Sequence, residues 1–205
     1  MNANAFWDVI GIYNQETCVI QIAFVLAIIF GLIYAYFKHK YWIPKIILSI
    51  VNLFIGITFF LIYGTEPIQY YFAAPLFILT GILFIYDAIK KPNISMNPFG
   101  VIHYILLALI ISYPFISFLL GHSFPKMVVW IMPCPFISFS ILIYSLYKQK
   151  NILILILLTI WGLTGVKSFF FNAYEDIILL ICGFYGIALI IEEINMIKGD
   201  NQSEI

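Results

Sequence analysis

Residues 152–171 read ILILILLTIWGLTGVKSFFF, an apolar run of 20 residues in which Lys167 is the single charged side chain. About 20 such residues form a helix long enough to cross the roughly 30 Å hydrocarbon layer of a bilayer. Similar runs recur along the chain with only short polar interruptions between them. They are continuously apolar, whereas the strands of a membrane barrel alternate. The pattern therefore predicts an all-α, polytopic membrane helix bundle.

Seven runs of this kind are predicted to be transmembrane helices, and together they form one domain over residues 17–192. The runs are 17–37, 43–63, 70–89, 99–120, 127–147, 152–171 and 173–192. Residues 1–16 contain spaced aromatic and aliphatic side chains, which predict a short interfacial helix in the outer leaflet. This segment lacks the basic start and small-residue cleavage site of a signal peptide, so we expect the first span to be retained. Residues 193–205 are expected to form a short cytoplasmic tail.

The composition excludes several classes of protein. Of the 205 residues, 63% are apolar and 10% are charged, and the mean hydropathy is +1.04. A soluble domain has about 45–50% apolar and about 25% charged residues. A multidomain soluble enzyme, a disordered chain and a nucleic-acid partner are therefore excluded. All 10 basic residues are lysines, which also excludes an arginine-rich voltage sensor.

The distribution of lysines predicts the orientation in the membrane. Two lysines, Lys126 and Lys167, lie toward one side of the predicted bundle. The other eight lie in the first, third and fifth loops, at the edges of these loops or in the tail: Lys38, Lys40, Lys45, Lys90, Lys91, Lys148, Lys150 and Lys198. Because cytoplasmic loops carry an excess of lysine, the N-terminus is predicted outside and the C-terminus inside.

The last two spans carry charges where hydrocarbon penalises them. An ionisable side chain within a membrane costs at least about 2.5–3.5 kcal/mol on insertion scales. Lys167 lies a few residues before the turn at Phe171-Asn172, and Asp176 lies a few residues after it. In an antiparallel hairpin the two side chains reach a similar depth. We therefore predict a Lys167–Asp176 ion pair, with Glu175 as the less favoured partner and a purely structural role as the alternative.

Prolines mark a second irregular region in the outer third of the predicted bundle. Pro133 and Pro135 flank Cys134 inside the fifth span, and each removes an N–H and clashes with the preceding turn. Two prolines so close together predict a helix break rather than a gentle kink. Pro114 is expected at a comparable depth in the fourth span, and Trp161 nearby in the sixth. These features predict an outward-facing cavity.

The candidate ligands of this cavity share a polar or aromatic side chain near the predicted outer end. They are His122, Lys126, Cys134, Trp161, Lys167, Glu175 and Asp176. The three cysteines, at positions 18, 134 and 182, have neither C-x-x-C spacing nor a disulfide pattern. No cofactor is expected, and a metal is left open.

On the predicted inner side, Asp87 and His103 end and begin consecutive spans. One interpretation is a pair that passes protons, because histidine titrates near neutral pH. The other, which we favour, is that Asp87 pairs with Lys90 or Lys91 while His103 bonds a backbone carbonyl.

Several motifs together resemble those of a family of small prokaryotic multi-pass inner-membrane proteins of unknown function. The motifs are Tyr13-Asn14, Gly121-His122 with Pro125, Pro133-Cys134-Pro135, Trp161 and Glu175-Asp176. The Pro-Cys-Pro break is the most specific of them, and the resemblance covers nearly the whole chain. It implies a location in the cell inner (cytoplasmic) membrane and implies no activity.

Three functions fit these features, and the first is favoured. The chain would bind or transport a small solute or ion through the outward-facing pocket, with the lipid bilayer as its surroundings and a thiophilic metal ion as one ligand to consider. The first alternative is a membrane sensor or assembly partner, and the second is a membrane-embedded lipid-modifying enzyme that uses Cys134 or His103. Retinal binding is rejected, because no lysine occurs from Ala173 to Ile197 to hold it.

Overall fold

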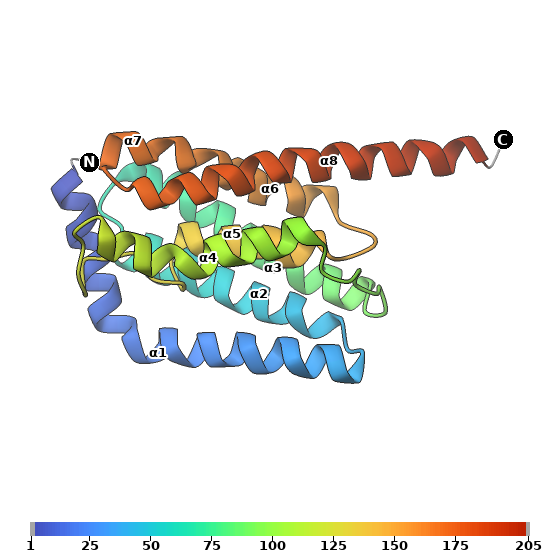
Figure 1. The fold of residues 1–205 in the computed structure, drawn as a ribbon, viewed down its shortest axis with the longest axis horizontal. Helices are drawn as coiled ribbons and strands as arrows, with labels where there is room; N and C mark the ends of the chain where they lie inside the picture. The colour runs from blue at the N-terminus through green and yellow to red at the C-terminus, as the bar shows by residue number, and fades with distance from the viewer. Residues whose placement is uncertain (1–2, 204–205) are drawn as a thin grey trace.

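The computed structural model describes the backbone of residues 3–203 and the side chains of residues 5–199, and the described chain is helical (Figure 1). The predicted all-α class is confirmed for these residues. The α-helices are α1 (Ala3–Lys38), α2 (Trp42–Ile55), α3 (Ala74–Lys90), α4 (Val101–Leu119), α5 (Pro133–Ser145), α6 (Ile152–Leu163), α7 (Ser168–Phe171) and α8 (Ile177–Ser203). Two π-helical segments, η1 (Gly56–Ile62) and η2 (Gln69–Ala73), extend α2 and α3, and two 3₁₀ segments, η3 (Thr164–Lys167) and η4 (Tyr174–Asp176), flank α7.

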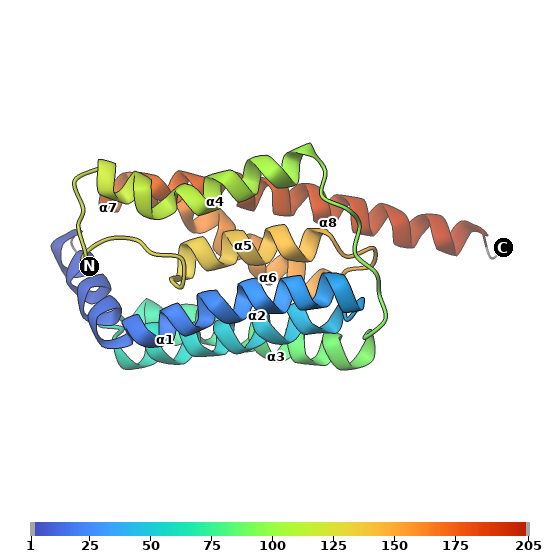
Figure 2. The same cartoon turned by 60° about the horizontal axis from the view of Figure 1, so that its bottom comes forward.

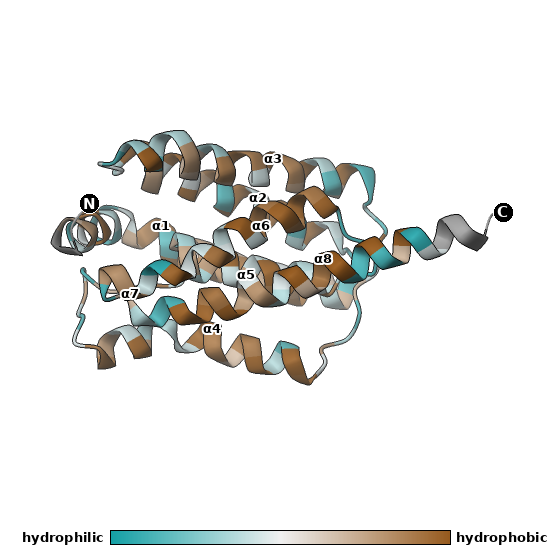
Figure 3. Cartoon of the chain, turned by 90° about the horizontal axis from the view of Figure 1, so that it is seen from above, coloured by the Kyte–Doolittle hydropathy of each residue, from teal (hydrophilic) through white to brown (hydrophobic). Residues whose placement is uncertain are grey.

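Six helical stretches in the described chain are long and apolar enough to cross a membrane. They are Ala5–Lys38, Trp42–Ile62, Gln69–Lys90, Val101–Leu119, Ile152–Phe171 and Tyr174–Gly199. Figure 3 shows apolar residues along these helices and hydrophilic ones concentrated in the connecting loops and in the last part of α8. Each of these stretches overlaps one predicted span. The predicted fifth span, residues 127–147, has no such stretch in the described chain.

Helix α5 is shorter than predicted, and the reason is local. A span over residues 127–147 was expected, but the helix has 13 residues and begins at Pro133. At 1.5 Å per residue it is about 20 Å long, too short for a bilayer core of about 30 Å. Pro133 and Pro135 occupy the first and third helical positions, where their missing N–H groups would have no partner anyway. The prolines therefore begin a helix within the bundle, and the residues before them, from Leu120 to Met132, form an irregular connection from α4.

The short helix α5 lies in the middle of the bundle. Figure 2 shows α4 and α8 on one side of it and α1, α2 and α3 on the other. α2 packs most extensively on α3, and α6 on α8, while α5 contacts α2, α4, α6 and α8. Every α5 side chain is buried except Cys134 and Phe139, which are partly exposed.

Close contact between α6 and α8 depends on two glycines, Gly162 and Gly183. A Cβ atom on Gly162 would lie 2.6 Å from the Cα of Gly183, nearer than side chains approach a backbone. A side chain at either position would therefore push these two helices apart.

The predicted interfacial helix is instead the first part of α1, continuous with the first span. Trp7, Ile10 and Tyr13 are buried, so these three side chains pack on the bundle. Figure 1 shows this part of α1 bent across the end of the bundle. The Thr17 hydroxyl donates to the Tyr13 carbonyl (2.6 Å), a bond within the helix that is known to favour bending.

This first part of α1 holds the irregular connection between α4 and α5. The Tyr13 hydroxyl donates to the carbonyl of Ile131 (2.6 Å), and the Asn14 amide donates to the carbonyls of Pro125 and Met127 (both 2.8 Å). Backbone groups without regular structure need such partners inside a membrane, because lipid offers none. The Tyr13-Asn14 pair therefore satisfies the backbone that leads into Pro133.

The bundle has two ends, which we name by the chain termini. At the N-terminal end lie the start of α1, the loop between η1 and η2, the α4–α5 connection and α7 (Figure 1). At the C-terminal end lie the other loops and the end of α8, which projects beyond the remaining helices. The predicted tail from residue 193 continues α8 as helix up to Ser203, and residues 204–205 lie outside the described part of the chain, as do residues 1–2 at the other terminus.

Candidate functional site

A cavity of about 270 Å³ lies at the N-terminal end of the bundle, where α5 begins. Much of its wall is aromatic, from Phe6, Phe59, Phe60, Phe72, Trp161 and Phe171. The first three residues of α5, Pro133, Cys134 and Pro135, also line it, together with Lys167, Ser168 and Asp176 from the hairpin of the last two spans. Its lining reaches the end of the bundle through Phe6, Glu66 and Phe171. The predicted cavity beside the proline pair is thus present in the structure.

The two π-helical segments form one side of the cavity. Phe59 and Phe60 come from η1, and Gln69 and Phe72 come from η2. The Gln69 side chain accepts hydrogen bonds from the backbone N–H groups of Thr65 (2.7 Å) and Glu66 (2.9 Å), which fixes the loop between the two segments. π-Helical turns widen a helix locally and often occur at functional sites.

Three polar side chains from different helices meet beside the start of α5. The Cys134 thiol lies next to the Asp176 carboxyl group and the Trp161 indole. Trp161 and Asp176 are only 4% and 5% exposed. The Cys134 thiol interacts weakly with both, and among the residues that the structure describes neither the Trp161 Nε1–H nor the Asp176 Oδ1 forms a hydrogen bond of standard geometry. Buried polar atoms are nearly always paired, so these two atoms mark a place for a ligand or for water.

The predicted Lys167–Asp176 ion pair does not form in the described structure. Both side chains line the cavity, but the Lys167 ammonium lies over the Trp161 ring, 4.7 Å from its centroid. The turn between them is where the sequence placed it, with Asn172 in the left-handed conformation (φ 54°). The prediction assumed α-helical arms, whereas Lys167 ends the 3₁₀ segment η3 and Asp176 ends η4. A 3₁₀ helix has 3.0 residues per turn, so the two side chains point in different directions from those expected.

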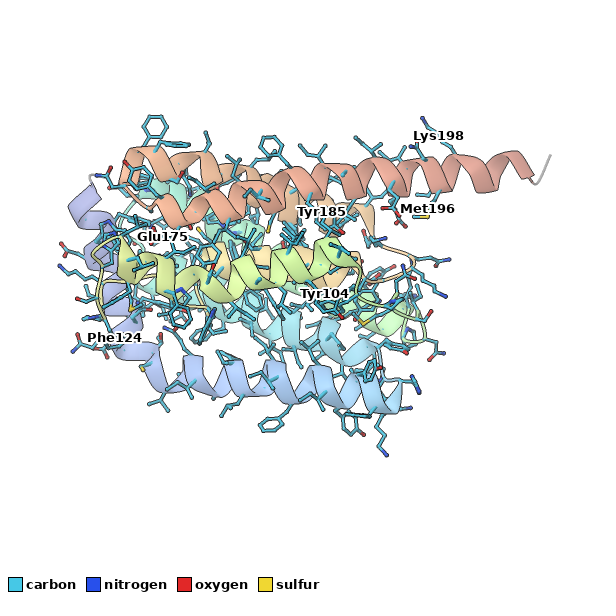
Figure 4. All side chains as sticks on the ribbon, viewed as in Figure 1. Tyr104, Phe124, Glu175, Tyr185, Met196 and Lys198 are labelled. Carbon is cyan, nitrogen blue, oxygen red and sulfur yellow. The ribbon has the colours of Figure 1, made fainter. Side chains whose placement is uncertain are left out.

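Glu175 lies outside this cavity, buried against α4. The Ser117 hydroxyl donates to the Glu175 Oε1 (2.8 Å) and accepts from the backbone N–H of Val128 (3.0 Å). Glu175 is 1% exposed, and its Oε2 has no partner among the described residues. Figure 4 shows Glu175 at the N-terminal end of α8, beside α4. The hydroxyl of Ser117 thereby ties α4, the α4–α5 connection and the last hairpin together.

Two other predicted ligands lie near this end of the bundle but outside the cavity. The His122 ring stacks on Trp7 with 3.7 Å between ring centroids, and Lys126 pairs with Asp8 at the exposed surface (2.5 Å). Pro114 lies within α4 and lines a second groove of about 300 Å³ with Cys18, Gln21 and Trp130. Of the seven candidate ligands, the structure therefore brings together Cys134, Trp161, Lys167 and Asp176.

The C-terminal end contains a buried ion pair that was not predicted. The Lys45 ammonium lies 2.7 Å from the Asp87 carboxylate, and both side chains are at most 2% exposed. The same carboxylate accepts from the Tyr144 hydroxyl (3.1 Å), and this hydroxyl accepts from the backbone N–H of Asn151 (2.7 Å). Lys45 also donates to the carbonyl of Lys91 (3.2 Å). We expected Lys90 or Lys91 as the partner, because Lys45 was read as the edge of a loop.

His103 pairs neither with Asp87 nor with a backbone carbonyl. Its Nδ1 accepts from the backbone N–H of Gly100 (2.9 Å), and its Nε2 lies 3.3 Å from the Tyr185 hydroxyl. Neither interpretation predicted the observed contacts: Asp87 pairs with Lys45, and His103 contacts Gly100 and Tyr185. A proton path that joins these two residues has no support in the described structure.

The cavity also contains residues that sequence reasoning missed. Phe60, Gln69 and Ser168 are the clearest of them, and the Ser168 hydroxyl is 1% exposed without a described partner. A glutamine at the start of an apolar run and a serine beside Lys167 were visible signals. Phe60 is one of 20 phenylalanines and could not be singled out.

A metal site has no support in the described part of the chain. No group of three or more histidine, cysteine, aspartate or glutamate side chains lies there in an arrangement that could hold a metal ion. In particular, His122 is occupied with Trp7 and does not line the cavity beside Cys134.

Comparisons with known proteins give a family and no activity. No curated protein matches this chain, and no solved structure matches it. Among protein families, the one described as a family of unknown function, DUF6064, matches residues 3–199, nearly the whole chain. The chain therefore belongs to this DUF6064 family.

Proposed function

We propose that this protein binds a small organic solute in the cavity at the start of α5 and carries it across a membrane. The observation that supports this most directly is that Trp161, Ser168 and Asp176, three residues with a buried polar atom that lacks a described partner, line one cavity. Solute sites are typically concave and mostly apolar, with a few polar groups that orient the ligand. The wall of this cavity has that composition.

The position of the cavity favours transport over the two alternatives. A helix that begins inside the bundle after an irregular segment is a common way for transporters to build a site in the membrane. An embedded enzyme with a Cys–His pair at Cys134 has no support, because none of the three histidines lines the cavity. The short loops between the helices offer little surface for a cytosolic signalling partner.

Orientation and location complete the proposal. The lysine-rich C-terminal end would face the cytoplasm, so the cavity would open outward from the cytoplasmic membrane of a prokaryotic cell. An exported, active alkaline phosphatase fused after Ile205 would contradict this orientation.

A test of solute binding uses the full-length protein in lipid nanodiscs. Its melting temperature would be measured against a panel of zwitterionic, cationic, anionic and neutral solutes of up to about ten heavy atoms. We expect one charge class to raise it, because a ligand stabilises the state that binds it. A matched pair of variants identifies the site: Cys134→Phe fills the cavity and should abolish the shift, while Cys18→Phe lies in the second groove and should retain it.

Transport is tested with the solute that gives the largest shift. Wild-type protein in proteoliposomes should accumulate this solute, and Cys134→Phe should not. If no solute of any class changes the melting temperature, or if Cys134→Phe retains the shift, the cavity is not a solute site. If the protein binds the solute but proteoliposomes do not accumulate it, the protein is a receptor and the proposed transport is wrong.

A further inference from the structure

The chemistry of the solute can be inferred from opposite charges in the cavity, on the basis of the proposed binding function. The first charge is Asp176. Its carboxyl group lines the cavity, is 5% exposed, and has an oxygen without a hydrogen-bond partner among the described residues. The neighbouring Cys134 thiol is only a weak donor to this carboxylate, and a positively charged donor would bind it most strongly.

The second charge is positive and has two sources. The Lys167 ammonium contacts the Trp161 ring and has no ion-pair partner among the residues that the structure describes. The N-terminus of α5, a helix of 13 residues, adds the positive end of its dipole. Because Pro133 and Pro135 have no N–H, the N–H of Cys134 is the donor in that turn. Helix N-termini with nearby cations are well suited to a carboxylate.

The remaining wall is mostly apolar, and six of its residues are aromatic. Phe60, Phe72 and Phe171 belong to it, and its volume of about 270 Å³ is that of roughly nine waters in the liquid. A ligand that fits would have a compact charged head and an apolar side chain. A purely cationic or purely anionic ligand would leave Lys167 or Asp176 without a partner in a site of low polarity, which is costly.

We propose that the solute is a small zwitterion with an ammonium and a carboxylate on one carbon and an apolar side chain, as in an apolar α-amino acid. Its ammonium binds Asp176, and its carboxylate binds Lys167 and the N-terminus of α5. Glu66 also lines the cavity, at the end of the bundle. The aromatic wall holds the side chain.

The test compares ligands that differ by one charge. Binding to the full-length protein in nanodiscs would be measured by calorimetry with L-phenylalanine, phenylalaninamide, which lacks the carboxylate, and 3-phenylpropionate, which lacks the ammonium. The same set is repeated for L-leucine, leucinamide and 4-methylpentanoate. We expect at least one amino acid to bind about tenfold or more tightly than both of its analogues, since each charged hydrogen bond contributes about 1.5–3 kcal/mol.

Two variants then assign each charge to a residue. Lys167→Met should weaken binding of the amino acid about tenfold or more and leave binding of its amide unchanged. Asp176→Asn should weaken the amino acid equally and leave the deamino acid unchanged. Lys167→Arg retains the charge and should retain binding, and Lys126→Met, outside the cavity, should bind as the wild type does. Melting curves of the ligand-free variants exclude unfolding as the cause.

The outcomes separate this inference from the proposed function. The zwitterion assignment is wrong if an amide or a deamino acid binds as tightly as its amino acid. It is also wrong if solutes of another charge class stabilise the protein while both amino acids do not. In either case the proposed solute site remains. If no solute in the panel binds, both are wrong. Equal effects of Lys167→Met on the amino acid and on its amide would also overturn the assignment of the carboxylate to Lys167.

Discussion

Buried charges occur at both ends of the bundle, and their surroundings differ. At the C-terminal end, the Asp87 carboxylate contacts Lys45 at 2.7 Å and accepts from Tyr144 at 3.1 Å. At the N-terminal end, Asp176 has an oxygen without a partner among the described residues, and Lys167, which lines the same cavity, lies over the Trp161 ring instead. Figure 4 shows how far apart the two ends lie, with Glu175 at one and Lys198 toward the other.

The difference separates a structural cluster from a binding site. Partners on α2, α3 and α5 satisfy the charges of Lys45 and Asp87, so this cluster holds three helices together. A buried polar group without a partner costs free energy and is retained only where another benefit offsets it. We therefore expect substitutions at the C-terminal end to lower stability and substitutions in the cavity to lower binding.

The largest effect is expected from breaking the Lys45–Asp87 pair. Lys45→Met leaves a carboxylate buried without a cation, which typically costs about 3–5 kcal/mol. Thermal melting in nanodiscs would measure the loss. The double variant Lys45→Met with Asp87→Leu should recover part of the stability, but not all, because Tyr144 loses its acceptor. If the two single losses simply add, the pair does not interact as the structure indicates.

A smaller effect is expected at the connection that leads into α5. Asn14→Leu removes the two hydrogen bonds that Asn14 donates to the carbonyls of Pro125 and Met127 and the one that it accepts from Gln21 (3.2 Å), at a cost of about 2 kcal/mol. The irregular segment should loosen, so a thiol reagent should modify Cys134 faster than it does in the wild type. Gln15→Leu, on an exposed neighbouring position, is the control and should change neither property.

The second ion pair of the C-terminal end should contribute less than the first. The ammonium of Lys150 lies 3.6 Å from Glu193, and the backbone N–H of Lys150 also donates to this carboxylate (2.9 Å). Lys150→Met keeps the backbone bond, so we expect a loss of about 1–2 kcal/mol in the same melting assay. A loss as large as that of Lys45→Met would show that the longer distance does not weaken the pair.

The smallest effect on stability is expected in the cavity itself. Asp176→Asn removes a buried charge that has no direct ion-pair partner in the described structure, so stability should change by less than about 1 kcal/mol, with a gain as the favoured direction. Asp87→Asn is the matched substitution at the other end and should be strongly destabilising. If both variants lose the same stability, the contrast between the two ends is wrong.

The sequence predicted most of the elements and only part of the site. Long apolar runs predicted six helices near their observed positions, because a span depends on the composition of about 20 consecutive residues. The sequence also predicted that Cys134, Trp161, Lys167 and Asp176 lie together, since all four are at a similar depth in their spans. It placed His122 and Lys126 there for the same reason, although depth alone does not tell which face of a helix a side chain occupies.

The sequence by itself determined the helical class, the positions of the long apolar helices and the interruption at Pro133 and Pro135. These properties follow from hydrophobicity and backbone sterics, which act between neighbours in the chain. Only the tertiary structure decided that Lys45 pairs with Asp87, that Asn14 holds the segment before α5, and that Lys167 faces Trp161. Each of these contacts depends on how helices rotate against one another and on short π and 3₁₀ segments, and packing sets those features across the bundle.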